Sequence, residues 1–252
     1  MMTTNFKRNY VPKSGFTKVS KIGESSLKML EFGIVELKNG EVCDFDTEET
    51  EAAFVILGGR CSVRSGGVAW ENIGVRRTVF EGKATSFYFG RHTKVQISTD
   101  WNVKIAVVQS PVKEDTKPFL IPPENVRSVL LGQQPWERDT HFIFDGSTPT
   151  KRFCIGEAFV TPGNWAGFPP HKHDTDNMPA EGVLEEIYYF LFHPQTGFGI
   201  QYVYTKDGEF DVAYPVKSDD LVEMPKGYHT TVTAPGYNSY FLWLMAGDNK
   251  GF

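Results

Sequence analysis

Short apolar runs alternate with turn residues along almost the whole chain, and long stretches of helical periodicity are nearly absent. Examples are residues 52–57, closed by Gly58-Gly59, and the later runs 94–99 and 103–109. Aromatic residues make up 14% of the sequence and occur with 24 Gly and 15 Pro, a composition that favours strands and tight turns. Many short strands with regular turn signals predict an all-β fold, either a sandwich or a barrel.

A proline-rich segment divides the chain into two β-rich halves. Residues 110–131 contain four prolines and interrupt the strand rhythm, which then resumes. We therefore expect two tandem β-barrels: an N-terminal barrel over 1–115, a linker over 116–150 with one helical turn, and a C-terminal barrel over 151–252. The first half contains no His-x-His pair, so we expect its barrel to be metal-free. Exposed barrel edges favour a homodimer.

Composition and charge exclude several classes of function. The net charge of −5 over 252 residues gives no electrostatic support for nucleic-acid binding. No apolar run approaches the roughly 18 residues of a membrane helix, and the polar segment 1–13 lacks the apolar core of a signal peptide. The three cysteines, Cys43, Cys61 and Cys154, are widely spaced and suggest neither a zinc pair nor a disulfide framework. A reducing, cytoplasmic setting is the simplest expectation.

Two histidines, His171 and His173, are separated by one residue after a Gly/Pro-rich approach. On a strand, such residues point to the same face and offer two imidazoles to one point. Taken alone, a His-x-His pair is more often two ordinary histidines than a metal site. Here an acidic residue, Glu185 or Glu186, opens the next aromatic strand, and His229 follows a Pro/Gly turn. Three imidazoles and one carboxylate are the donor set of a divalent-metal site.

The order His-x-His, Glu, His resembles the cupin superfamily, and the surrounding segments look like the 5-deoxy-glucuronate isomerase family of inositol catabolism. That family is related to 5-keto-4-deoxyuronate isomerase. The resemblance is densest from Thr161 to Gly247. The segments that carry it include Pro-Pro-His-Lys-His-Asp at 169–174, Leu-Glu-Glu-Ile-Tyr-Tyr at 184–189, Gly-Phe-Gly-Ile-Gln at 197–201 and Pro-Lys-Gly-Tyr-His at 225–229.

The resemblance implies a bicupin fold with one divalent metal ion (Zn, Mn, Fe or Ni) in the C-terminal barrel. Carried over by position, the implied ligands are His171, His173, Glu186 and His229. Glu186 is preferred to Glu185 because Ile-Tyr-Tyr follows it, as after the ligand Glu of cupins. Strand alternation allows only one of the two on the metal face, and Glu185 stays open as the alternative.

The family's reaction is an aldose–ketose isomerisation, an intramolecular oxidoreduction of a small sugar acid from 5-deoxy-glucuronate to 5-dehydro-2-deoxy-gluconate. Such a reaction needs a general base on one face of the substrate. Glu157 is our first choice because it interrupts the apolar strand 153–160, which leads into the metal motif. A solvent-facing carboxylate is the equally weighted alternative. Tyr188 and Gln201 are the further candidates for the pocket wall.

The substrate carboxylate needs a cation, for which Arg152 and Lys226 are the sequence candidates. Lys172 alternates away from its two histidine neighbours and is expected to point outward. Tyr202 stands where the family has Arg after the Gln of segment 197–201, which predicts altered carboxylate recognition or another uronate or sugar acid as substrate. An iron-dependent cupin dioxygenase and a non-catalytic sugar-binding cupin are the competing functions.

Overall fold

The computed structural model describes residues 5–248, so the first four residues of the polar N-terminal segment and the chain end at Phe252 lie outside it. This part of the chain forms 21 strands in four antiparallel sheets and one short 3₁₀ turn, η1 (Pro123–Asn125). No helix within these residues is long and apolar enough to cross a membrane. The prediction of an all-β chain is confirmed.

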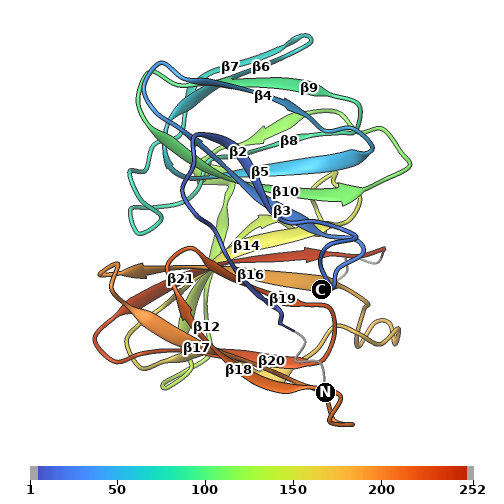
Figure 1. Cartoon of the computed structure of the whole chain (residues 1–252), viewed down its shortest axis with the longest axis vertical. Helices are drawn as coiled ribbons and strands as arrows, with labels where there is room; N and C mark the ends of the chain where they lie inside the picture. The colour runs from blue at the N-terminus through green and yellow to red at the C-terminus, as the bar shows by residue number, and fades with distance from the viewer. Residues whose placement is uncertain (1–4, 249–252) are drawn as a thin grey trace.

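Two sheets form the N-terminal barrel, which occupies the blue-to-green upper half of Figure 1. The larger sheet has the order β11 (Phe119–Ile121), β8 (Ser86–Phe89), β5 (Thr50–Gly59), β10 (Val103–Pro111), β3 (Glu31–Leu37) and β2 (Gly15–Ser20). The smaller has the order β4 (Val42–Asp46), β9 (Lys94–Ser98), β6 (Cys61–Ser65) and β7 (Val68–Ile73). Strand β4 alternates cleanly, with Cys43 and Phe45 buried against the facing sheet and their neighbours exposed.

The C-terminal barrel is built in the same way and contains all four histidine and glutamate positions of the predicted metal site. Its larger sheet has the order β1 (Lys7–Asn9), β19 (Asp220–Met224), β16 (Glu185–His193), β21 (Asn238–Ala246), β14 (Phe153–Val160), β13 (Arg138–Phe144) and β12 (Arg127–Leu131). Its smaller sheet has the order β15 (Trp165–His171), β20 (Tyr228–Thr233), β17 (Phe198–Tyr204) and β18 (Asp211–Lys217).

The two larger sheets pack against each other and form a third core between the barrels. Strands β14, β16 and β21 are therefore buried on both faces. In β16, Ile187 and Tyr189 enter the core between the barrels, whereas Tyr188 and Phe190 enter the interior of the C-terminal barrel. This double burial explains why these strands read as continuous apolar runs rather than as alternating ones.

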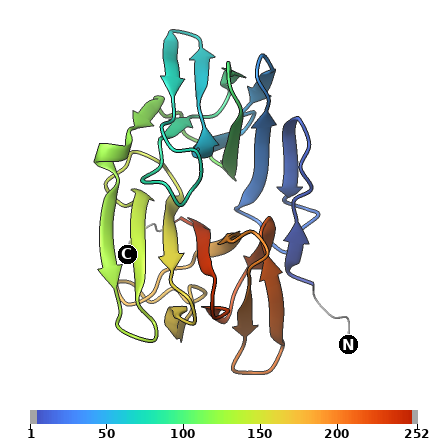
Figure 2. The ribbon, with the colours of Figure 1, turned by 90° about the vertical axis from the view of Figure 1, so that its left-hand side faces the viewer.

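The prediction that 116–150 is a linker is wrong. Strand β11 pairs with β8 of the N-terminal sheet, whereas β12 and β13 extend the larger C-terminal sheet through pairing with β14. Strand β1 likewise pairs with β19 of the C-terminal barrel, and Figure 2 shows the blue N-terminal segment running down beside that barrel. The prolines misled the prediction because Pro118, Pro122 and Pro123 lie between the strands, where no ladder hydrogen bond is needed.

Candidate metal centre

Three imidazoles converge in the interior of the C-terminal barrel. His171 ends β15 and lies directly opposite His229 of the neighbouring strand β20. His173 follows two residues later, and one ring nitrogen from each histidine lies within 4.8 Å of the others. In residues 5–248 this is the only group of three histidine, cysteine, aspartate or glutamate side chains with such spacing. The structure thus brings together the three histidines that the sequence singled out.

Glu186 completes the group from β16. Its Oε2 atom lies 2.9 Å from Nε2 of His229 and 3.7 Å from Nε2 of His173. Yet Glu186 Oε2 and His229 Nε2 are both buried without a hydrogen-bond partner. Nδ1 of His229 lies 3.4 Å from the carbonyl oxygen of Gly227, and a proton donated there leaves a lone pair on Nε2. Two buried lone-pair atoms that face each other suit a cation, so these residues fit a divalent metal ion.

The electrostatics agree with a metal-ligand role. Burial, followed by the nearby imidazole of His229, lowers the pKa of His171 to about 4. Burial also lowers the pKa of His173. Burial opposes the charge of Glu186, but the surrounding imidazoles, His229 first, hold the pKa of this carboxyl below its usual value. At neutral pH His171 and His173 therefore offer neutral imidazoles and Glu186 an ionised carboxylate, the forms that bind metal.

Glu185 and Glu186 point to opposite faces of β16, as strand alternation requires. Both carboxylate oxygens of Glu185 accept a hydrogen bond from the backbone N–H of Lys28, each at 2.9 Å, and Oε2 accepts a further one from Met29 at 2.7 Å. Through these hydrogen bonds, Glu185 of the C-terminal barrel binds the backbone of the N-terminal half of the chain. Of the two carboxylates, only Glu186 lies with the histidines.

A pocket with a volume of about 100 Å³ opens beside the histidines. Its wall includes Tyr188, whose ring is 5.7 Å from that of His229 in an edge-on arrangement. Burial, and then the negative charge of Glu186, raise the pKa of Tyr188 well above its usual value, so its hydroxyl stays protonated. The remaining wall is mostly apolar and comes from β12, β13, β14, β15 and β21: Leu131, Phe142, Ala158, Gly167, Phe241, Trp243 and Met245.

Glu157, our first choice for the general base, is not brought to this pocket. It lies on the opposite face of β14, fully buried between the barrels. Its Oε1 atom is 2.5 Å from Nη2 of Arg76 and accepts a 3.0 Å hydrogen bond from the hydroxyl of Tyr240. Its Oε2 atom is 3.6 Å from Nδ1 of His141. The carboxylate is neither exposed, as the alternative had it, nor able to reach a substrate, and its function is to pair with Arg76.

Gln201 points into the interior of the C-terminal barrel but does not line the pocket. It is fully buried, and its Nε2 donates to Sδ of Met224 at 3.4 Å. Met224 lies opposite Glu186 in register, so Gln201 is adjacent to the strand position that supplies the carboxylate. Its Oε1 has no hydrogen-bond partner among the described residues.

The cations that the sequence suggested for the substrate carboxylate lie elsewhere. Arg152 pairs with Asp248 at 2.8 Å, and Lys226 pairs with Glu209 on the surface. Tyr202 is on the outer face of β17, stacked on Tyr204 with ring centroids 4.9 Å apart, so its identity does not alter the pocket.

The residue that the sequence reasoning missed is Arg138, which opens β13 and lines the pocket. It lies within the segment 116–150 that the sequence predicts to be a linker. The alternation of Arg138, Thr140 and Phe142 along one face of 138–144 was the signal that could have found it.

Lys172 points away from the two histidines that flank it, as expected. Its Nζ atom contacts Asp174 and lies 2.6 Å from Oε1 of Glu181. Glu181 also accepts a 2.8 Å hydrogen bond from the backbone N–H of Thr175, and Asp174 accepts one of the same length from Gly227. These rim charges therefore organise the loop between β15 and β16 rather than bind metal.

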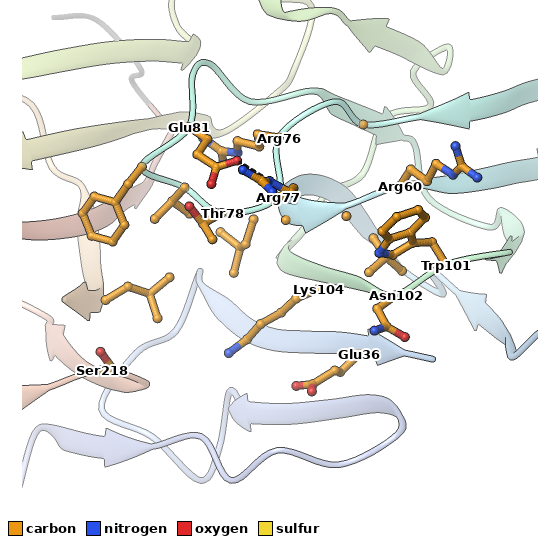
Figure 3. A pocket seen from close by; sticks show the side chains of 18 of the residues that line it. Glu36, Arg60, Arg76, Arg77, Thr78, Glu81, Trp101, Asn102, Lys104 and Ser218 are labelled. Carbon is orange, nitrogen blue, oxygen red and sulfur yellow. Dashed lines mark hydrogen bonds and ion pairs between the residues drawn. The ribbon is translucent and has the colours of Figure 1, made fainter. Parts of the chain in front are cut away.

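A larger pocket of about 1160 Å³ lies at the junction of the two barrels (Figure 3). Its charged side chains neutralise one another: Arg77 pairs with Glu81 at 3.1 Å and Lys104 with Asp219 at 2.5 Å. It contains none of the predicted metal ligands. The imidazole and carboxylate groups that could bind a metal ion line the smaller pocket.

Comparison with known proteins agrees with this geometry. Residues 8–252 match the KduI/IolB family. The chain belongs to this family. Among its KduI/IolB relatives, the 5-deoxy-glucuronate isomerase of Geobacillus kaustophilus is 38% identical over 86% of this chain and 79% of its own. The enzyme of the same name from Bacillus subtilis strain 168 is 34% identical over 90% of this chain and 84% of its own.

Solved structures confirm the predicted fold class, a two-barrel cupin. An IolB-like protein from Salmonella typhimurium superimposes with a TM-score of 0.94 at 31% identity and covers 98% of this chain and 95% of its own. Oxalate decarboxylase from Lactobacillus farciminis superimposes with a TM-score of 0.73 at 10% identity over all of this chain and 88% of its own. The latter likeness concerns the fold alone.

Proposed function

We propose that this protein is a metal-dependent sugar-acid isomerase that converts 5-deoxy-glucuronate to 5-dehydro-2-deoxy-gluconate in myo-inositol catabolism. The observation that carries the proposal is the convergence of His171, His173, His229 and Glu186 beside a pocket. The choice of substrate is based on the relatives named 5-deoxy-glucuronate isomerase. Isomerases of this kind need a site that stabilises negative charge on two adjacent substrate oxygens.

A divalent metal ion would be held by these three imidazoles and this carboxylate. When bound, such an ion supplies Lewis-acid stabilisation of the charge that builds on the carbonyl and hydroxyl oxygens. Zn, Mn, Fe and Ni all accept imidazole with one carboxylate, so metal availability rather than the donor set selects among them.

The protein's own side chains orient the substrate and keep water away. The hydroxyl of Tyr188, kept protonated by its raised pKa, donates a hydrogen bond to a substrate oxygen as negative charge develops there. The apolar wall formed by Phe142, Phe241 and Trp243 lowers the local polarity, which strengthens that interaction. Gly167 has φ of +61°, a conformation that favours glycine, and a Cβ atom there would occupy space in van der Waals contact with the His171 ring and the Tyr188 hydroxyl, 3.5 Å from each.

We also infer a cytoplasmic protein that acts on a small molecule. Cys43 and Cys61 are free and buried, as suits a reducing compartment, and burial raises the pKa of the Cys61 thiol to about 12. Homodimer formation stays a prediction from the exposed barrel edges.

The test is to incubate purified protein, loaded with Mn²⁺ or Zn²⁺, with 5-deoxy-glucuronate and to follow the aldose and ketose signals by proton NMR. We expect one ketose molecule to form for each aldose molecule consumed, without O₂ consumption. A dioxygenase would consume O₂, so this measurement separates the two functions. Tyr188→Phe should retain metal and lose about 10- to 100-fold in kcat, because one donor to the developing charge is removed. Absence of turnover by folded, metal-loaded wild-type protein would refute the proposed function.

A further inference from the structure

Arg138 is the only lysine or arginine among the described residues that line the metal-site pocket. It begins β13, and strand alternation places Arg138, Thr140 and Phe142 on the pocket face. His141 lies on the opposite face, with Nδ1 3.6 Å from Glu157 in the region between the barrels. Arg138 therefore shares its cavity with the histidines although it lies on the larger sheet, whereas His171 and His229 lie on the smaller one.

Two polar groups on this face have no partner. Nη1 of Arg138 and Oγ1 of Thr140 are both buried without a hydrogen bond, and no carboxylate of residues 5–248 forms an ion pair with Arg138. Burial lowers the pKa of Arg138, the direction expected of a cation that lacks a close counter-charge. Arg152, by contrast, is paired with Asp248. Arg138 is half-buried, and a cation whose buried Nη1 has no partner is unfavourable, so the pocket is complementary to an anionic ligand.

We propose that Arg138, with Thr140 beside it, binds the carboxylate of the substrate and so makes the pocket specific for sugar acids over neutral sugars. The planar guanidinium matches a carboxylate with two parallel hydrogen bonds, and the Thr140 hydroxyl can donate a third. The carboxylate end of the ligand then lies toward β13 and the reacting carbonyl end toward the histidines. The identity of the reaction rests on the proposed function, whereas the preference for an acid is a separate property of the pocket.

Charge balance supports this orientation. The pocket also contains the carboxylate of Glu186, which would repel an anionic ligand. A divalent cation held by the histidines at one end and Arg138 at the other would together outweigh that single negative charge. A neutral analogue gains nothing from Arg138 and leaves its guanidinium unpaired, which is the basis of discrimination.

The experiment compares 5-deoxy-glucuronate with its uncharged carboxamide, using metal-loaded wild-type protein, Arg138→Gln and, as the matched control, Arg152→Gln. For Arg138→Gln we expect the ratio of kcat/KM for acid over amide to fall about 10- to 100-fold, mainly through KM for the acid. Arg152→Gln should keep the wild-type ratio. Equal losses for acid and amide, or an unchanged ratio in Arg138→Gln, would overturn the proposal.

Calorimetry keeps this test independent of turnover. The affinities of the metal-loaded proteins for glucuronate and for glucuronamide give the preference for acid over amide directly. This measurement remains possible even if the wild type isomerises neither 5-deoxy-glucuronate nor its carboxamide. Should Arg138→Gln fail to fold, Arg138→Lys and Thr140→Val replace it. Each should reduce the acid-over-amide preference about 3- to 10-fold, because one hydrogen bond to the carboxylate is lost. If both variants bind acid and amide with the wild-type ratio, the proposal is wrong.

Discussion

The buried ion pair between Arg76 and Glu157 joins the two barrels, and its removal gives a large, calculable effect. The two atoms in contact are 2.5 Å apart, and the side chains are 1% and 0% exposed. Glu157→Gln leaves the guanidinium buried without a counter-charge, which costs about 3 to 5 kcal/mol. For a chain of this size, each kcal/mol lowers the melting temperature by about 2 to 4 °C, so we expect a fall of about 6 to 20 °C.

Calorimetric unfolding of wild type and Glu157→Gln measures this loss, and Arg77→Gln is the matched control. Arg77 is adjacent in sequence, but its side chain is 84% exposed and pairs with Glu81 on the surface, so its removal should shift the melting temperature by less than about 2 °C. The double variant Arg76→Met/Glu157→Leu should recover part of the stability, because neither charge is then buried.

The pH dependence of the same difference has a defined sign. Burial opposes the charge of Glu157, but Arg76 and His141 together outweigh burial and hold the pKa of this carboxyl below its usual value. The stabilisation is therefore fully present above the unfolded-state pKa of about 4.3 and is lost as the pH falls through the folded-state pKa. The difference in melting temperature between wild type and Glu157→Gln should stay constant from pH 6 to 8 and become smaller below about pH 4.

Activity measured well below the melting temperature completes this test. Because Glu157 does not reach the pocket, Glu157→Gln should keep kcat within about threefold of wild type when folded and metal-loaded. A kcat lowered a hundredfold or more in a variant of near wild-type stability would refute the reasoning and restore Glu157 as the general base.

Three further predictions concern the surroundings of the metal centre. Glu186→Gln should weaken metal binding at least tenfold by titration, whereas Glu185→Gln should leave metal binding intact and destabilise the fold by about 1 to 3 kcal/mol, because backbone donors of the N-terminal barrel lose a charged acceptor. Gly156→Ala should destabilise by about 1 to 3 kcal/mol and alter tryptophan fluorescence, because its Cβ would lie 2.1 Å from Cζ2 of Trp243; an unchanged melting curve would contradict this. Tyr202→Phe should leave KM within about twofold, and a larger rise would show that the outer face of β17 affects substrate binding.

The convergence of the three histidines could be predicted in part, because two of them are close together in the sequence. His171 and His173 are two residues apart, and strand alternation allows only one of Glu185 and Glu186 on their side, but the preference for Glu186 came from the resemblance to cupins. His229 follows a Pro/Gly turn that the sequence displays directly. The all-β fold could likewise be predicted from the spacing of turns and apolar runs.

Glu157 could not be placed from the sequence because β14 is buried on both faces. Its alternate residues enter two different cores, so the pattern of polar and apolar side chains does not say which face adjoins the pocket. Arg138 was not predicted as a pocket residue for a different reason. Its strand, β13, pairs antiparallel with the next strand, β14, but the prolines that precede it led to the prediction of a linker across the whole segment 116–150.

The most direct test of the account is to titrate metal-free protein with Mn²⁺ or Zn²⁺ while bound metal and isomerisation of 5-deoxy-glucuronate are measured on the same samples. We predict that activity rises in proportion to bound metal and saturates at one ion per chain, and that His171→Ala and His229→Ala bind metal at least tenfold more weakly. Full turnover by metal-free protein, or unchanged metal binding in both variants, would contradict the assignment of this site.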